Sequence, residues 1–183
     1  MDRIITTCSE DRFTESEAFV ERVFTESEDA ESGAIVRGLL HEIREKKYYV
    51  PELDLIMTDG EGGEIIGLAT FSRFHLEGRY EDELLIFTPM AVKTELQRQH
   101  ISKELIEFGI NRGRELGYKA IIVEGNPLNY RPRGFVTSVD FGIYAHESVG
   151  LPAPECLMVQ ELVPGALEHI HGVLDYRFYE HLR

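Results

Sequence analysis

LLIFTPMAVKTELQRQHISKELIEF, residues 84–108, is the stretch that decides the fold. Its first nine residues form a nearly continuous apolar run, which is typical of a strand covered on both faces. Pro89 inside this run cannot donate a ladder hydrogen bond, so we expect an irregularity in the strand there. After a polar turn, Ile101, Leu105 and Phe108 recur at helical spacing. The stretch therefore predicts a strand, a turn and a helix.

The residues that follow predict a second strand parallel to the first. Gly117 is placed to close the helix, and KAIIVEG, residues 119–125, is again apolar and rich in β-branched residues. A strand, a helix and a strand in this order favour parallel pairing of the two strands. We expect the segments 84–92 and 120–124 to pair in this way.

The residues before this unit predict two helices and an antiparallel hairpin. RIITTCS, residues 3–9, resembles a first strand, and Thr14 with Glu17 forms a capping-box pattern at the start of a helix. A second helix is expected over Ala34–Glu45. Two apolar runs flank the turn residues 59–63, and the second of these strands runs toward His75.

Composition favours one acidic domain, residues 1–183. Its 183 residues, 43% hydrophobic, suffice for a single core, and no linker or repeat divides them. The formal net charge of −14 opposes binding to nucleic acid or to an anionic membrane and favours a neutral or cationic substrate. No apolar run approaches 18 residues and the N-terminus has no signal-peptide core, so we expect a cytoplasmic protein.

The cysteine and histidine spacings predict no metal site. Cys8 and Cys156 stand alone, without a CxxC pattern, and are expected to be reduced thiols. His169 and His171 form an H-x-H pair that has no third ligand in the sequence.

The turn at Gln97–Ser102 is a candidate anion site, because a helix N-terminus exposes unpaired N–H groups. Between Lys93 and Lys119 six Lys or Arg residues face four Asp or Glu residues, inside a strongly acidic chain. The alternative is a solvated helix face of mixed charge. Neither the P-loop nor the dinucleotide fingerprint is present.

These motifs together resemble the GCN5-related N-acetyltransferase (GNAT) superfamily, and within it the YhbS-like branch. The resemblance is carried by residues 84–106, by LGYKAIIVEGNPLNYRPRGF at 116–135, by MVQELVPGAL at 158–167 and by HGVLDY at 171–176. It implies an α/β, GNAT-like acyl-CoA N-acyltransferase fold. Such a fold has a mixed, mostly antiparallel sheet, flanked by helices, with a central splayed pair of parallel strands. Acetyl-CoA is the implied cosubstrate, with no metal.

The resemblance also implies the residues that hold acetyl-CoA. The strand segment Met90, Ala91 and Val92 would pair with the pantetheine arm, and the motif Q/R-x-x-G-x-G/A would hold the pyrophosphate. This motif falls on Gln97, Arg98, Gln99, His100, Ile101 and Ser102. Lys103, directly after it, and Asn126 are the further residues expected to bind the cofactor.

His100 and Ser102 stand where the family has glycines, and Asn126 stands where the branch has aspartate. A histidine Cβ narrows the turn, whereas its ring can donate a hydrogen bond to a phosphate oxygen. We expect the hydrogen bond from the ring to outweigh the narrowing of the turn by the Cβ.

Three residues are candidates for catalysis. Tyr130 survives in the branch signature, and the resemblance implies that it protonates the leaving thiolate, although its ring can equally be packing beside Phe135. An amine of pKa about 10.4 is neutral in only about one part in 2,500 at pH 7, so a base is useful. Glu83 and Glu124 are the acidic candidates, and a solvated or ion-paired carboxylate is the alternative for each. A backbone N–H near Met90 is the expected oxyanion donor.

The expected function is N-acetyl transfer to an amine of a small molecule or protein by direct attack in a ternary complex. One alternative is a GNAT-like module that binds CoA without catalysis and acts through a partner. Another is a non-enzymatic acidic interaction protein. The tail VLDYRFYEHL, residues 173–182, can cover a partner in a homodimer or the core of its own chain.

Overall fold

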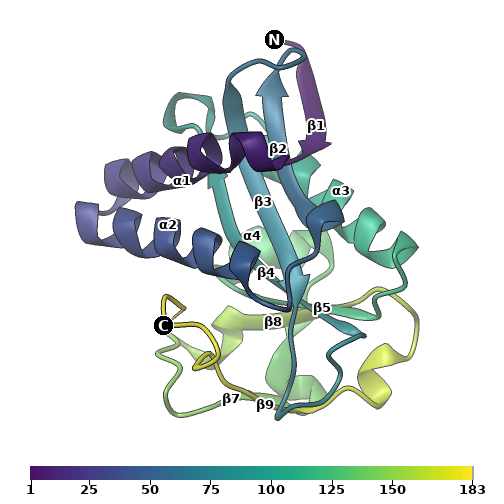
Figure 1. Ribbon diagram of the computed structural model, residues 1–183. Helices are drawn as coiled ribbons and strands as arrows, with labels where there is room; N and C mark the ends of the chain where they lie inside the picture. Colours follow the sequence, from purple (N-terminus) through teal and green to yellow (C-terminus); the bar gives the residue numbers. More distant parts are fainter. Residues whose placement is uncertain (183) are drawn as a thin grey trace. The chain divides into compact units, whose positions relative to one another are not determined.

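The computed structural model describes residues 1–182 (Figure 1). The chain forms two compact units. The first unit holds Met1–Ser72 and Thr88–Gly109, and the second holds Arg73–Phe87 and the chain from Ile110 onward. The helices are α1 (Phe13–Ser27), α2 (Ala30–Glu45), α3 (Ile101–Glu115) and α4 (Pro127–Tyr130). The strands are β1 (Arg3–Thr7), β2 (Asp54–Asp59), β3 (Ile65–Arg73), β4 (Leu84–Val92), β5 (Ala120–Glu124), β6 (Val136–Thr137), β7 (Ile143–Ala145), β8 (Leu157–Glu161) and β9 (Gly172–Leu174).

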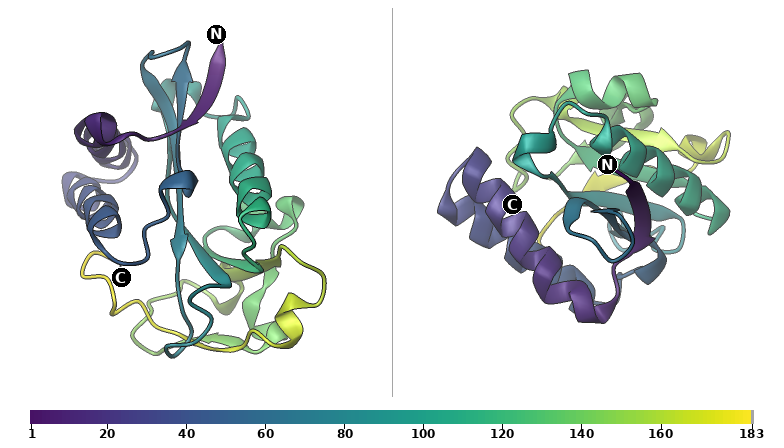
Figure 2. Two further views of the ribbon diagram at one scale, coloured as in Figure 1. Left: turned by 45° about the vertical axis from the view of Figure 1, so that its right-hand side comes forward. Right: turned by 90° about the horizontal axis from the view of Figure 1, so that it is seen from above.

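The first unit contains the expected antiparallel strands. Thr7 of β1 lies opposite Leu55 of β2, and Asp54 of β2 lies opposite Thr70 of β3. The turn between β2 and β3 uses Gly60 and Gly62, both with positive φ, so the predicted hairpin is confirmed. Figure 2 shows α1 and α2 on one side of β2 and β3, and the start of α3 on the other.

Two predicted helix starts are wrong. Helix α1 begins at Phe13, directly after a 3-10 turn, and no side chain caps it, so Thr14 lies inside the first turn and makes no capping box. Helix α2 begins at Ala30 rather than Ala34. The carboxylate of Asp29 accepts a hydrogen bond of 2.7 Å from the Ser32 N–H and caps the helix four residues earlier than expected.

Two glycines let α3 approach β3 closely. A Cβ on Gly67 would lie 2.8 Å from side-chain atoms of Ile101 and Leu105, and a Cβ on Gly109 would lie 2.1 Å from the Phe71 ring. Gly109, not Phe108, therefore faces the strand. Phe108 is 42% exposed, contrary to the helical spacing that grouped it with Leu105.

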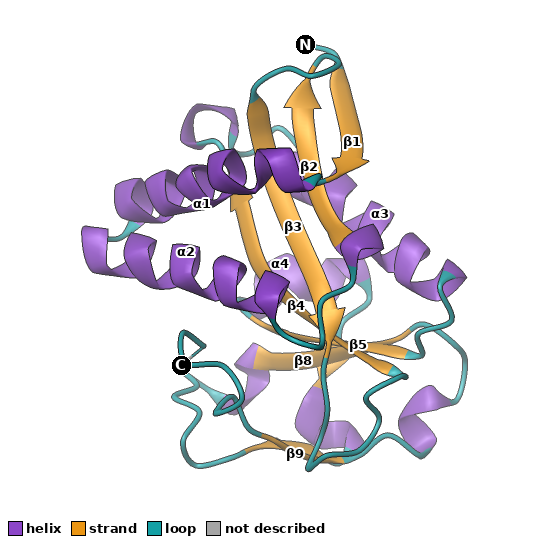
Figure 3. Cartoon of the chain, viewed as in Figure 1, coloured by secondary structure: helices purple, strands orange, loops and turns teal. Residues whose placement is uncertain are grey.

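The second unit contains the expected parallel pair. Leu84 to Ile86 of β4 lie opposite Ala120 to Ile122 of β5, and β8 pairs antiparallel with β5 and with β6. In hydrogen-bonded order the strands of this mixed sheet are β1-β2-β3-β4-β5-β8-β6, with β4 belonging to both units. The predicted fold class is confirmed. Strands β7 and β9 form a separate parallel pair, and loops make up much of this unit (Figure 3).

The C-terminal tail packs on its own unit. Tyr176 and Tyr179 are 4% and 2% exposed, and the Tyr179 ring stacks on Phe74 with a centroid distance of 6.0 Å. These two rings therefore cover the core of their own chain, and the homodimer stays a prediction. Among the described residues, no helix has both the length and the apolar composition needed to cross a membrane.

A buried ion network joins α2 to β2 in the first unit. The Arg44 guanidinium donates to Asp54 over 2.9 Å and to Glu17 over 3.3 Å, and its side chain is 2% exposed. The Asp54 carboxylate also accepts hydrogen bonds from the hydroxyls of Tyr49 and Thr70. Because Asp54 is fully buried, its charge depends on these partners.

We expect Arg44→Met to lower the free energy of unfolding by about 3–5 kcal/mol, because it leaves the Asp54 charge buried without its cation. The matched control is Arg37→Met on the same helix. Because Arg37 forms an exposed pair with Glu21, its loss should lower the free energy of unfolding by less than about 1 kcal/mol. Urea denaturation measures both. Similar losses in the two variants would contradict this role for Arg44.

Candidate functional site

The first unit contains a strand end followed by an exposed turn. Ala91 and Val92 at the end of β4 are buried, whereas Met90 is partly exposed. A 3-10 turn at Thr94–Leu96 follows, and residues 97–100 are all exposed before α3 begins. The predicted residues from Met90 to Lys103 are thus brought together in one continuous segment of this unit.

The N-terminus of α3 presents free backbone donors. The first intrahelical bond runs from the Glu104 N–H to the His100 carbonyl, at 3.0 Å. The N–H groups of residues 101–103 precede it and have no carbonyl four residues back in the helix. The Ile101 side chain is 1% exposed and packs against Gly67, which fixes this end of the helix.

The turn has a glycine-like backbone without glycine. His100 has φ +66° and Arg98 has φ +63°, both in the left-handed region. An L-residue in this region costs about 1–2 kcal/mol relative to the right-handed conformation. His100 therefore keeps the backbone conformation of a turn glycine and adds a side chain to it.

The positive charges of the turn differ in their partners. The Lys93 ammonium contacts both carboxylate oxygens of Glu64 at 2.9 Å, so its charge is neutralised. Lys103 lies 3.9 Å from Glu107, and both side chains are more than half exposed, which makes this pair weak. Arg98 has no ion-pair partner among residues 1–182. Arg98 and Lys103 are the cations most available to an anion at this turn.

In the second unit, Glu124 lies at the carboxyl end of β5 with a buried tyrosine beside it. The Tyr176 hydroxyl donates a hydrogen bond of 2.9 Å to the Glu124 carboxylate. Glu124 is an exposed residue, but partial burial of its carboxylate raises its pKa above the usual value, and the bond from Tyr176 lowers this pKa in part. Burial and the neighbouring Glu124 charge raise the pKa of Tyr176. Glu124 is thus a carboxylate with increased proton affinity.

Glu83 lies at the other end of the parallel pair. It precedes β4, whereas Glu124 ends β5, and because the strands run in the same direction these two carboxylates are not brought together. The Glu83 carboxylate lies 2.8 Å from His169 Nε2, an ion pair if the ring is protonated. Within residues 1–182, no group of three or more His, Cys, Asp or Glu side chains is arranged to hold a metal ion.

Tyr130 is packed on three sides in the second unit. Its ring lies edge-on to Phe87 and Phe135, with centroid distances of 6.3 Å and 5.6 Å. A Cβ on Gly125 would lie 2.5 Å from this ring, so the glycine makes room for it. Burial raises the pKa of Tyr130, which keeps its hydroxyl protonated at neutral pH. That hydroxyl has no hydrogen-bond partner in the described part of the chain.

Asn126 has a structural contact at the start of α4. Its side-chain oxygen accepts a hydrogen bond of 3.0 Å from the Leu128 N–H and caps this short helix, which ends at Tyr130. An aspartate oxygen can cap in the same way, so the Asn126 side chain preserves the turn.

The sequence patterns did not predict that Tyr176 contacts Glu124 or that His169 contacts Glu83. Tyr176 is 52 residues from Glu124 in the chain, and His169 is 86 residues from Glu83. The available signal for Tyr176 was its position at the end of HGVLDY, one of the stretches that carried the family resemblance.

Comparison with known proteins supports the expected family. The model of the acetyltransferase (GNAT) family matches residues 12–141. The Escherichia coli K12 protein named uncharacterized N-acetyltransferase YhbS is 29% identical over 147 residues, which cover 78% of this chain and 80% of that protein.

Two solved structures have the same fold. The crystal structure of Escherichia coli YhbS in complex with CoA has a TM-score of 0.82 and 24% identity, covering 98% of this chain and 91% of that one. A GNAT-family acetyltransferase from Brucella melitensis in complex with acetyl-CoA has a TM-score of 0.71 and 19% identity, covering 97% and 99%. The expected likeness to the YhbS-like branch is confirmed.

We expect Tyr176→Phe to raise the pKa of Glu124 further, because the variant removes the hydrogen bond that stabilises the ionised carboxylate. Carbon-13 NMR titration of the glutamate carboxyl groups measures this change. Tyr144→Phe, at a tyrosine that is 53% exposed, is the control and should leave the Glu124 titration in place. A Glu124 pKa that stays constant or falls in Tyr176→Phe would show that the bond has no such effect.

Proposed function

The chain belongs to the acetyltransferase (GNAT) family, and from this premise we propose that it transfers the acetyl group of acetyl-CoA to an amine. The acceptor is an amine of a small molecule or of a protein, and it attacks directly within a ternary complex. The observation that carries the proposal is the turn before α3, which keeps a glycine-like backbone at His100 and leads into free N–H groups at a helix N-terminus.

In this proposal the first unit holds the cosubstrate. Backbone groups of Met90, Ala91 and Val92 pair with the pantetheine arm. The N–H groups of residues 101–103, with the side chains of Arg98 and Lys103, face the pyrophosphate. The turn is completed by Gln97, Gln99 and His100. In the second unit, Asn126 contributes by capping the start of α4. The CoA and acetyl-CoA complexes of the two similar structures support acetyl-CoA as the cosubstrate.

The second unit supplies the acid and the base. Glu124, directly or through a water molecule, takes the proton from the attacking amine, because its raised pKa suits a general base. The amine nitrogen bonds to the acetyl carbon, a backbone N–H near Met90 stabilises the oxyanion, and the carbon–sulfur bond then breaks. The Tyr130 hydroxyl donates its proton to the departing thiolate. Glu83 is the weaker candidate base, because His169 engages its carboxylate at the opposite end of the strand pair.

Two measurements test the proposed function. Calorimetry with acetyl-CoA tests binding, and an amine panel with detection of free CoA tests transfer. Binding together with turnover on at least one amine is the expected result. Binding without turnover on a broad panel would favour the alternative of a module that binds CoA and acts through a partner. No heat and no thermal shift at millimolar acetyl-CoA would overturn both.

We expect His100→Gly to weaken acetyl-CoA binding by about 0.5–1.5 kcal/mol, because the ring no longer donates a hydrogen bond to the pyrophosphate. His100→Asn is the control, since asparagine tolerates the left-handed region and keeps an N–H donor. It should lose less affinity than His100→Gly. Calorimetry measures all three proteins, and a tenfold gain in affinity for His100→Gly would identify the histidine side chain as an obstruction.

Tyr130→Phe should lower turnover at pH 7 by about 10- to 100-fold, the low end of general acid catalysis, because a thiolate of pKa about 8.5 leaves without much help. The deficit should shrink as the pH rises past that value, and acetyl-CoA affinity should change little. Turnover against pH, with Tyr144→Phe as control, measures the effect. Unchanged turnover in Tyr130→Phe would leave Tyr130 as a packing residue.

A further inference from the structure

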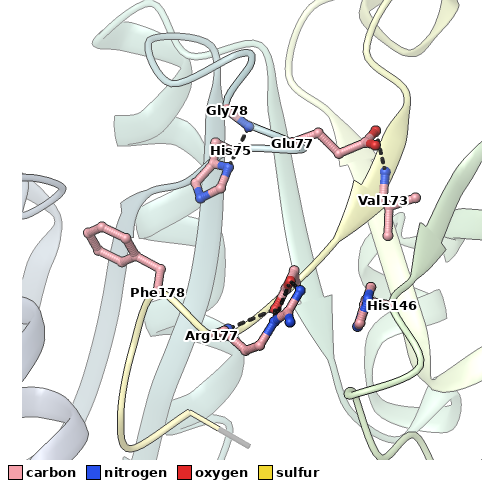
Figure 4. Close-up of a pocket in the computed structure, with 8 residues that line it drawn as sticks. His75, Glu77, Gly78, His146, Val173, Arg177 and Phe178 are labelled. Atoms are coloured by element: carbon pink, nitrogen blue, oxygen red, sulfur yellow. Dashed lines mark hydrogen bonds and ion pairs between the residues drawn. The ribbon is translucent and has the colours of Figure 1, made fainter.

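A pocket of about 520 Å³ lies within the second unit, outside the groups assigned above (Figure 4). Its walls come from the loop after β3, from the residue after β7 and from the chain after β9. The side chains that matter are those of His75, Glu77, His146, Asp175, Arg177 and Phe178. Its size falls within the range of small-molecule sites.

Two carboxylates are fixed in the wall of this pocket. Glu77 accepts a hydrogen bond of 3.2 Å from the Val173 N–H, and a Cβ on Gly172 would lie 2.8 Å from this carboxylate, so the glycine leaves space for it. Asp175 accepts a hydrogen bond of 2.7 Å from Arg177 Nε. Hydrogen bonding from Arg177 lowers the pKa of Asp175 to about 2, so it is ionised at neutral pH.

The arginines beside these carboxylates face water. Arg177 is 68% exposed, and Arg79 lies 3.8 Å from Glu77 with 53% exposure. Glu77 and Arg79 form a long and exposed pair, which is weak, so a cation entering the pocket can compete for Glu77. Arg177 holds Asp175 more firmly, because its Nε, a terminal guanidinium nitrogen and its backbone N–H all donate to this carboxylate.

An aromatic wall completes the pocket. The Phe178 ring lies edge-on to His75 and Phe74, with centroid distances of 6.2 Å and 6.5 Å, and His75 stacks on Phe74 at 5.0 Å. His75 Nδ1 accepts a hydrogen bond from the Gly78 N–H, which fixes the ring. Aromatic faces attract cations and pack against the methylene groups of an alkyl chain.

The pocket wall and the candidate base share one stretch of chain. Asp175 and Arg177 line the pocket, and Tyr176 between them is bonded to Glu124. Tyr176 is only 4% exposed, so the pocket wall is joined to Glu124 through the buried ring of Tyr176.

We propose that this pocket anchors the acceptor, and that the acceptor is a small diamine or polyamine. One ammonium group binds between Glu77 and Asp175 with its methylene groups against Phe178, while a second amine is left to react near Glu124. A single cation of this kind suits a pocket that combines two carboxylates with an aromatic side chain, Phe178. The inference rests on the proposed function for the reaction of that second amine, whereas the binding of the first does not require acetyl-CoA.

The test is binding of 1,4-diaminobutane to the full chain without acetyl-CoA, followed by amide NMR. We expect shift changes to cluster at residues 75–78, 146 and 173–178, and 1-aminobutane to bind at least about fivefold more weakly. Glu77→Gln should weaken diamine binding about tenfold. Glu155→Gln, an exposed carboxylate of the same unit outside the pocket, is the matched control and should bind like the unmodified protein.

Three results would overturn the anchor. These are shift changes away from the pocket, equal binding of the monoamine, and unchanged affinity in both Glu77→Gln and the second variant Asp175→Asn. Thermal unfolding of each variant excludes loss of the fold as the cause. Failure of the proposed function can be told apart from failure of the anchor. It appears as absent acetyl-CoA binding in calorimetry, independently of whether the diamine binds.

Discussion

The candidate site depends on how briefly β4 pairs with β5. Only Leu84 to Ile86 lie opposite β5 residues, although β4 continues to Val92 and β5 to Glu124. Backbone groups of β4 beyond Ile86 find no partner in β5, and polar backbone groups require one. In the proposal the pantetheine arm supplies that partner. Strand β4 is followed by the turn before α3, where we propose that the pyrophosphate binds. Strand β5 ends at Glu124, the proposed base, shortly before α4.

Much of the fold follows from local sequence patterns. The apolar run at residues 84–92, the helix after the turn and the next apolar run predicted the parallel pair, and the glycine turn at 59–63 predicted the hairpin. The errors concern choices between equally plausible local signals. Asp29 rather than a later residue caps α2, and Gly109 displaces Phe108 from the face that packs on β3. The Asp29 cap is a local hydrogen bond from the Ser32 N–H, whereas the position of Gly109 against the Phe71 ring depends on tertiary packing, which overrides local preference.

The sequence allowed candidate site residues to be proposed where they belong to a continuous motif, and not where they come together only in the fold. The turn at residues 97–102 and Tyr130 were proposed by motif, and their roles stay predictions. The Tyr176–Glu124 bond and the Glu83–His169 contact join distant parts of the chain, and they help to distinguish the environments of the two candidate carboxylates. The backbone at His100 was also hidden, because the identity of a non-glycine residue does not predict a positive φ.

The most direct test of this account is an amide NMR titration of the full chain with acetyl-CoA. We expect shift changes concentrated at Met90–Val92 and at residues 97–103, because backbone N–H groups there would contact the pantetheine arm and the pyrophosphate. Strand β1, at Arg3–Thr7, should stay unchanged as an internal reference. Shift changes that avoid both segments, or no change at millimolar acetyl-CoA, would contradict the assignment of the site.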